Sequence, residues 1–207
     1  SYDSKIIYIT DDQVSPFIDR SRLTHRPNWN WINLVTLLQT FTSNDLYLDV
    51  QSDNFFVKEI NLFNSEGLPR IFQSSYNDIN NLGHPPYFNF SQNVFDIPKV
   101  NTGYSYIIEF LLYDRKKLKK IVDQYPSIEE LLETCYANVT QESYPADQEI
   151  YGNLLEKHFP NDYEFVANFP VIHEGSHISP SREQLEEFIS INKQQGKVFT
   201  CSYHTYF

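Results

Sequence analysis

Acidic residues gather where a strand-like segment ends, in the stretch LYLDVQSDNFFVKEI at residues 46–60. Its first half alternates in period two, which predicts a buried β-strand with three apolar residues on one side: Leu46, Leu48 and Val50. Asp49 and Asp53 flank the exit of that strand. Asp favours turns at strand ends, but open α/β sheets also bind their ligands at the carboxyl ends of their strands. The segment therefore predicts either a turn or a metal site with Asp53 as a ligand.

Two further segments carry polar residues at places where chemistry is feasible. Asp147 begins a predicted helix in YPADQEIYGNLL at residues 144–155, where a carboxylate could take a proton from a substrate hydroxyl as general base. The helix dipole and the unpaired amides of a first turn favour an acid there without any function. Upstream, the run 101–103 (Asn-Thr-Gly) precedes a predicted strand and would let a ligand approach the backbone closely, although a plain turn explains it equally well.

The elements that position these residues follow from periodicity, caps and breakers. Strands are predicted at 5–10 (KIIYIT), 46–50, 69–73, 104–113, 163–169 and, as an edge strand, 198–203. Helices are predicted at 28–41, from 115 after the cap Asp114, from Ser127, at 146–158 and at 180–196. Residues 74–103, which contain Gly83-His84-Pro85-Pro86, are predicted to form a long ordered loop. Strands alternating with helices indicate a single mixed α/β domain.

Charge and composition limit the classes of partner. The 207 residues carry 16 Lys plus Arg against 27 Asp plus Glu, a net charge of −11, which argues against nucleic acid or an anionic membrane as a partner. A phosphate-bearing substrate would need a cation or a local basic group. Cys135 and Cys201 lack metal-site or disulfide spacing, and no signal peptide or membrane span is evident, so a cytoplasmic protein is expected. The absence of methionine is consistent with a fragment of a longer protein or a processed product.

Three segments in this order resemble GT-A-type glycosyltransferases. VQSDNFFVKEI (50–60) is similar to the strand-end DxD segment of that fold, KVNTGYSYIIEFLLYDRKKL (99–118) to the NTG-plus-strand segment of glycogenin-like enzymes, and YPADQEIYGNLL (144–155) to their DQ-helix. The resemblance covers roughly residues 5–175. It implies a single GT-A-like domain over residues 1–207, with a mixed, mostly parallel central sheet flanked by helices.

The resemblance also implies a reaction: transfer of a hexosyl or deoxyhexosyl group from a UDP-sugar donor to a glycan or protein-linked acceptor. The leaving diphosphate gains charge as the bond breaks, so a hard cation such as Mn²⁺ or Mg²⁺ assists it as a Lewis acid. Asp53 is the expected metal ligand, joined by His173 or, alternatively, His177 in a predicted loop after a strand. Gln51 replaces the first acid of the motif and is expected to bind a ribose hydroxyl, with Asp49 as a substitute carboxylate.

The remaining expected roles also come from the resemblance. The catalytic candidates are Asp147, as general base, and Glu149. The other substrate-binding candidates are Asp11, Asn101, Thr102, Gly103 and Gln148. A basic cluster between residues 115 and 120 either meets a diphosphate or anionic acceptor or is the solvated face of an amphipathic helix. The alternative function is a non-catalytic carbohydrate- or protein-binding module that kept a degenerate GT-A fold. A metal-dependent phosphohydrolase is disfavoured because the carboxylates are not densely clustered.

Overall fold

The computed structural model describes most of the chain in nine stretches: 9–38, 42–51, 54–56, 58–75, 84–108, 110–169, 171–176, 181–195 and 200–205. In the stretches 171–176 and 200–205 the backbone alone is described. None of the helices in these stretches is both long and apolar enough to cross a membrane. The predicted strand 5–10 falls largely outside the described residues; its last residue, Thr10, caps the short helix α1 (Asp11–Val14).

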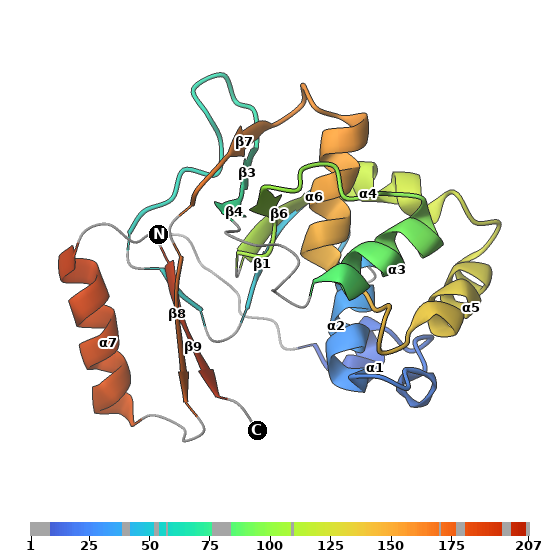
Figure 1. Cartoon of the computed structure of the whole chain (residues 1–207), viewed down its shortest axis with the longest axis horizontal. Helices are drawn as coiled ribbons and strands as arrows, with labels where there is room; N and C mark the ends of the chain where they lie inside the picture. The colour runs from blue at the N-terminus through green and yellow to red at the C-terminus, as the bar shows by residue number, and fades with distance from the viewer. Residues whose placement is uncertain are drawn as a thin grey trace.

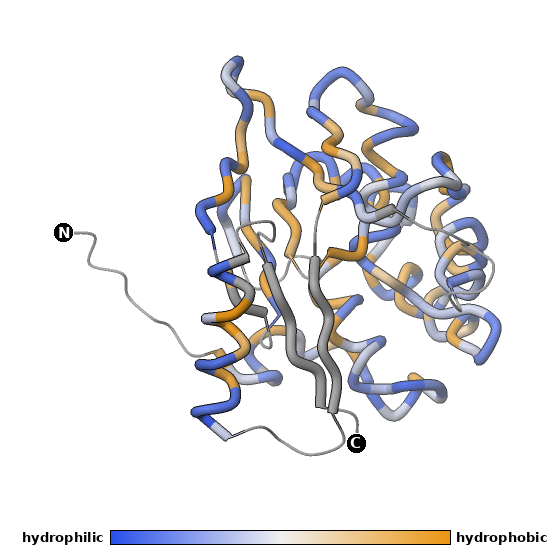
Figure 2. The backbone as a smooth tube through the Cα atoms, turned by 60° about the vertical axis from the view of Figure 1, so that its left-hand side comes forward, coloured by the Kyte–Doolittle hydropathy of each residue, from blue (hydrophilic) through white to orange (hydrophobic). Residues whose placement is uncertain are grey.

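Helices form one side of the molecule in Figure 1. They are α2 (Pro27–Leu38), α3 (Pro85–Phe95), α4 (Arg115–Val122), α5 (Ile128–Asn138) and α6 (Asp147–His158), with a 3₁₀ turn at Arg20–Arg22. Helix α6 contacts both α2 and α3, and α3 also contacts α5. The last helix, α7 (Arg182–Gln195), lies apart from this group, alongside two strands near the C-terminus (Figures 1 and 2).

The strands pair in both directions. Three pairings are antiparallel: β1 (Leu46–Val50) with β6 (Phe110–Asp114), β4 (Ser74–Ser75) with β5 (Tyr104–Ser105), and β2 (Asn54–Phe56) with β9 (Thr200–Thr205). Two are parallel: β3 (Arg70–Phe72) with β7 (Glu164–Val166), and β8 (Val171–Ser176) with β9. The fold is mixed α/β as predicted, but the mostly parallel central sheet is wrong for the described residues. The described strands form four small sheets, and the two parallel pairs lie in different ones, because β1 pairs with the distant β6 and β3 with the distant β7.

Strand β1 has the predicted bounds but the opposite face turned inward. Leu46, Leu48 and Val50 are each about two-fifths exposed, whereas Tyr47 and Asp49 on the other face are half-buried. The Tyr47 hydroxyl donates to the carbonyl of Thr36 in α2 at 2.9 Å. Alternation determines which residues share a face of a strand, but the elements that pack against it decide which face is covered.

Three hydrophobic clusters are found among the described residues, the smallest of which joins Tyr87, Tyr144 and Ala146. The largest one joins the helices and the inner face of β6, and its fully buried members include Leu34, Phe90, Tyr106, Tyr113 and Leu154. The second cluster contains four buried residues: Phe72, Ile108, Phe110 and Phe169. In the tube view, hydrophobic stretches alternate with hydrophilic ones along the helices, as expected for helices with one buried side (Figure 2). Cys135 is a free cysteine among the described residues and packs in the largest cluster, where burial raises the pKa of its thiol to about 12.

The predicted long loop is wrong, because residues 85–95 form helix α3. Pro85 and Pro86 occupy its first turn, where a missing N–H costs nothing and the fixed φ suits a helix. The helix ends at Asp96, which adopts a left-handed φ of 52°. The predicted strand 104–113 is likewise two strands, β5 and β6, that pair with different partners.

The C-terminal strands also differ from expectation. Strand β9 was predicted as an edge strand, but it is the central strand of the order β2-β9-β8. Strand β8 was predicted as a loop around His173. By contrast, the predicted helices α4, α5 and α6 are confirmed. Two of them have their own caps, with Asp114 accepting from the Lys116 and Lys117 amides and Ser127 accepting from the Glu130 amide.

Gly152 brings α6 against the ring of Tyr106. A Cβ at Gly152 would lie 2.1 Å from Cγ of Tyr106, which is fully buried. Alanine normally stabilises a helix by about 1 kcal/mol relative to glycine, but overpacking costs about 1–3 kcal/mol or more. We therefore expect Gly152→Ala to lower the free energy of unfolding in urea titrations. Gly103→Ala is the control, because its Cβ would meet only Asn101 Oδ1 at 3.5 Å; equal stability of both variants would contradict this packing.

Candidate functional site

The first turn of α6 carries three consecutive polar residues that bind three different parts of the chain. The helix has no capping side chain of its own, since residue 146 is alanine, and Asn33 Oδ1 of α2 accepts instead from the Asp147 amide at 2.7 Å. Gln148 Oε1 accepts from the Ile108 amide at 3.1 Å. Glu149 reaches the segment before β5, as described below. This turn is therefore fixed in place by α2 and by the chain that flanks β5 and β6.

Asp147 lies beside the inner face of the β1–β6 ladder. The Tyr113 hydroxyl of β6 donates to Asp147 Oδ2. The ring of Tyr113 stacks on that of Tyr47 of β1, with ring centroids 5.1 Å apart and an angle of 11° between the planes. Its centroid also lies 4.7 Å from that of Tyr151 of α6. Asp147 as a whole residue is half-buried. Its carboxylate therefore lies against a group of three tyrosine rings: Tyr47, Tyr113 and Tyr151.

Asp49 completes a pair of carboxylates with Asp147. It projects from the same face of β1 as Tyr47, one residue before the strand ends, and is half-buried. Burial raises the pKa of Asp49 above its ordinary value. Burial, and secondly the charge of Asp49, raise the pKa of Asp147 to about 7, against the lowering effect of the Tyr113 hydroxyl. Strongly raised carboxyl pKa values in a reachable position are typical of general acids, general bases and cation sites.

Glu149 has a different environment although it is only two residues away. Its carboxylate accepts from four donors: Ser105 Oγ at 2.6 Å, the Tyr106 amide at 3.1 Å, Lys99 Nζ at 2.8 Å and Asn153 Nδ2 at 3.1 Å. The Glu149 side chain is 1% exposed and that of Lys99 is 7% exposed. A carboxylate with all its acceptor sites occupied has none left for a substrate proton. The geometry gives Glu149, a predicted catalytic residue, a structural role.

The predicted metal ligands are only partly described. Asp53 and His177 lie outside the described residues, as does the side chain of His173. The backbone of His173 lies in β8, level with Ser202 of β9, and Ser202 is in turn level with Asn54 of β2. His173 is thus two strands, roughly 10 Å, from the residue that follows Asp53. Among the described side chains no group of three or more His, Cys, Asp or Glu could hold a metal ion.

The other predicted substrate-binding residues are dispersed. Gln51 follows β1 and is half-buried. Asn101 Oδ1 accepts from the Gly103 amide at 3.0 Å across Thr102, so the Asn-Thr-Gly run is a turn before β5. Asp11 pairs with Arg20 beside a separate cavity of about 260 Å³ against Trp31 of α2. The structure groups none of these residues with the Asp49–Asp147 pair.

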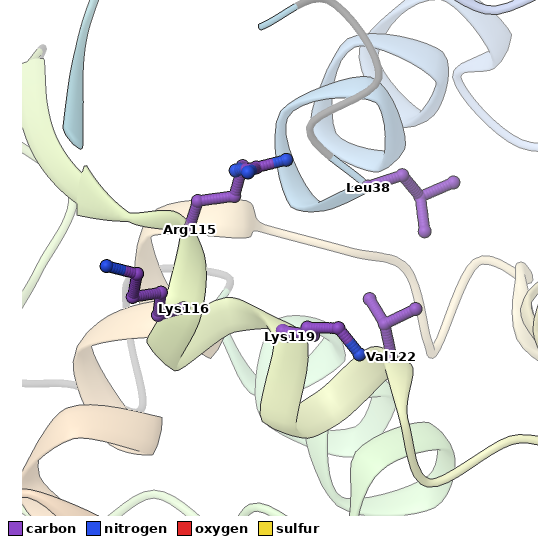
Figure 3. Close-up of a pocket in the computed structure, with 5 residues that line it drawn as sticks. All are labelled: Leu38, Arg115, Lys116, Lys119 and Val122. Atoms are coloured by element: carbon purple, nitrogen blue, oxygen red, sulfur yellow. The ribbon is translucent and has the colours of Figure 1, made fainter. Parts of the chain in front are cut away.

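The basic cluster of α4 lines an open cavity of about 240 Å³ against Leu38, the last residue of α2 (Figure 3). Lys116 pairs with Asp45 at 2.7 Å and Lys119 pairs with Asp123, so two of the three cations that line it are neutralised. Leu118 and Ile121 are fully buried on the other side of the helix. The cluster is the solvated face of an amphipathic helix, and it lies at the opposite end of β1 from Asp49.

Sequence reasoning missed the groups that set the environment of Asp147. Asp49 was predicted as a carboxylate at the end of β1, but Tyr47, two residues earlier on the same face, was not, although this spacing predicts a shared face. Asn33 and Tyr113 lie 114 and 34 residues from Asp147, and no local pattern connects them.

No protein-family model and no curated protein matches the chain.

The raised pKa of Asp147 predicts a pH-dependent stability. Its folded pKa of about 7 exceeds the ordinary 3.8, so the folded state holds this proton more tightly. The contribution to stability is complete below about pH 4 and is lost as the pH rises through 7. Asp147→Asn keeps an acceptor for the Tyr113 hydroxyl without titrating. In urea titrations, the free energy of unfolding of the variant should therefore rise relative to that of the wild type between pH 4 and 8. The relative change should reach up to about 4 kcal/mol, at about 1.4 kcal/mol per pKa unit.

Tyr113→Phe is the matched control for this measurement. It removes the hydroxyl that lowers the pKa of Asp147, so the pH at which the stability is lost should move upward. Parallel stability profiles for the wild type and Asp147→Asn from pH 4 to 8 would contradict the assigned pKa.

The Lys99–Glu149 ion pair predicts strong energetic coupling. Because both charges are buried, Lys99→Met should destabilise the protein by about 3–5 kcal/mol by leaving the Glu149 carboxylate without its cation. The double variant Lys99→Met/Glu149→Gln removes both charges and keeps the acceptor for Ser105, so it should lose much less than the two single variants together. Additive losses in urea unfolding would show that the pair is not formed.

Proposed function

We propose that this protein is a metal-dependent glycosyltransferase that moves a sugar from a UDP-sugar donor to a hydroxyl of a glycan or protein-linked acceptor. The observation that carries the proposal is Asp147, a half-buried residue whose carboxyl accepts from the Tyr113 hydroxyl and has a pKa of about 7. A general base is most effective when its pKa is near the working pH. An Asp with an ordinary pKa would be too weak a base for an acceptor hydroxyl.

The chain's own residues divide the remaining work. Asp147 accepts the proton of the acceptor hydroxyl as the hydroxyl oxygen attacks the anomeric carbon of the sugar, whose bond to the diphosphate breaks and releases UDP. The Tyr113 hydroxyl orients its carboxylate, and the bond from Asn33 holds the start of α6 in register with β6. The charge of Asp49 favours the protonated form of Asp147 once the proton has arrived. Each of these groups acts on Asp147, which alone exchanges the proton.

The residues near the end of β1 suit a divalent cation. Asp53 would hold it, with His173 as a second ligand, since the order β2-β9-β8 sets the backbone of His173 level with that of Asn54. Carboxylate and imidazole ligands are compatible with Mn²⁺. When bound, the cation would supply charge neutralisation for the diphosphate, which a protein of net charge −11 otherwise repels.

Gln51 favours the second candidate, a non-catalytic module with a degenerate GT-A fold. It occupies the place of the first acid of the DxD-like segment and supplies no charge. Such a module would bind a carbohydrate or protein partner and turn over no donor.

The proposal predicts separate defects in donor binding and in chemistry. UDP with Mn²⁺ should raise the melting temperature of the wild type through ligand linkage. Asp53→Ala should abolish that shift. Asp147→Asn should keep the shift and lose donor hydrolysis and transfer by about 10²–10⁴-fold. In the wild type, kcat/KM should rise with pH through about 7, because the base must be ionised.

Lys58→Ala is a control outside the proposed machinery and should retain both activities. A melting temperature that no nucleoside diphosphate changes would overturn donor binding. A normal shift without any turnover in the wild type would instead support the binding module.

A further inference from the structure

An open cavity of about 330 Å³ lies at the carboxyl end of the parallel strands β3 and β7. Both strands end on it, at Phe72 and at Val166. Parallel strands that end together form the edge where α/β proteins commonly bind ligands. The volume is at the lower limit of the roughly 300–1,000 Å³ of small-molecule sites, so it suits a compact ligand.

The floor of the cavity is aromatic and rigid. Phe72 and Phe169 are 5% and 6% exposed, and their ring centroids are 4.6 Å apart. The ring centroid of Phe110, which does not line the cavity, lies 5.6 Å from the centroid of each of these rings. An apolar floor of this kind packs well against the C–H face of a sugar ring, which is the usual role of aromatic rings in contact with carbohydrate.

The rim of the cavity carries side-chain amides that can hydrogen-bond to a ligand. Asn61 and Asn168 are exposed on it, and within the described part of the chain neither side-chain amide has a hydrogen-bond partner. Arg70 also lines the cavity; its Nε donates to Glu164 at 2.9 Å. Two amides offer donors and acceptors side by side, the combination that neighbouring sugar hydroxyls require.

The backbone fixes the position of Asn168 on the rim. Its φ is 58°, in the left-handed region that asparagine adopts more readily than most other residues. The backbone of Gln73 holds the chain on both sides of Asn168, because its amide donates to the Val166 carbonyl at 2.9 Å and its carbonyl accepts from the Phe169 amide at 2.8 Å. The amide of Asn168 is thus presented from a turn that is hydrogen-bonded to the end of β3.

The charges around the cavity select a neutral ligand. Glu164 neutralises Arg70, and the exposed Glu59 adds a negative charge to the rim. A diphosphate or another anion would be repelled here, whereas sugar hydroxyls can donate to carboxylates and accept from amides. The cavity therefore does not duplicate the proposed donor site.

The β1–β6 ladder separates this cavity from Asp147. Phe110, behind the cavity floor, lies opposite Val50, whereas Asp49 and Tyr113 project from the other face of the same two strands. A ligand in the cavity is thus on the far side of the ladder from the carboxylate pair. We propose that the cavity binds a neutral pyranose ring of a glycan, remote from the ring that reacts. The binding of a pyranose by this cavity does not depend on the proposed function. The further role, in which the bound ring anchors the acceptor glycan of the transferase, rests on the proposed function.

Ligand-observed NMR with a panel of methyl pyranosides, without nucleotide or metal, tests this site. At least one pyranoside should bind the wild type. Asn61→Ala and Asn168→Gly should each weaken binding about fivefold, the effect of one lost hydrogen bond; glycine retains the left-handed backbone. Asn161→Ala, which removes an exposed amide elsewhere, should bind as the wild type does, and so should Asp147→Asn, even if the protein transfers no sugar.

Three results would overturn the assignment. One is no binding of any pyranoside at high millimolar concentration. Another is binding that Asn61→Ala and Asn168→Gly leave unchanged. The third is binding of uridine, weakened by the same two variants, with no sugar bound, which would make the cavity a nucleobase site.

Discussion

The burial of polar side chains at the first turn of α6 is the constraint on which the rest of the structure depends. Asp147, Gln148 and Glu149 follow one another in the chain, and each bonds a different segment. A buried carboxylate or amide without partners would cost several kcal/mol. The positions of α2, β5 and β6 around α6 are therefore coupled, because moving any one of them would leave a buried group unsatisfied.

The same turn shows how environment separates two carboxylates of similar chemistry. The carboxylate of Glu149 pairs with the Lys99 ammonium and accepts hydrogen bonds from three further donors, which fix it in place. For Asp147, burial and secondly the charge of Asp49 raise the pKa to about 7, although the Tyr113 hydroxyl lowers it. One acid therefore holds the fold together, and the other is available for proton transfer. The distinction arises from the partners and not from the residue type.

The β1–β6 ladder extends this separation across the molecule. One face carries Tyr47, Asp49 and Tyr113 toward Asp147, and the other carries Phe110 toward the aromatic cavity. Because residues of a strand alternate between faces, one pair of short strands can support two sites of different polarity. The left-handed backbone at Asn168 belongs to the second site and is held by the neighbouring strand end at Gln73.

Local patterns in the sequence were sufficient for the helices with their own caps, α4 and α5, and for the bounds of β1, since caps and alternation involve residues a few positions apart. They also singled out Asp147 and Asp49. Local patterns misjudged Pro85 and Pro86, which begin α3, because proline both stops one element and starts another. Tertiary structure alone decided which face of β1 is covered, which strands pair, and which partners surround Asp147 and Glu149. Those outcomes depend on desolvation and on partners such as Asn33 and Tyr113, which come from distant parts of the chain.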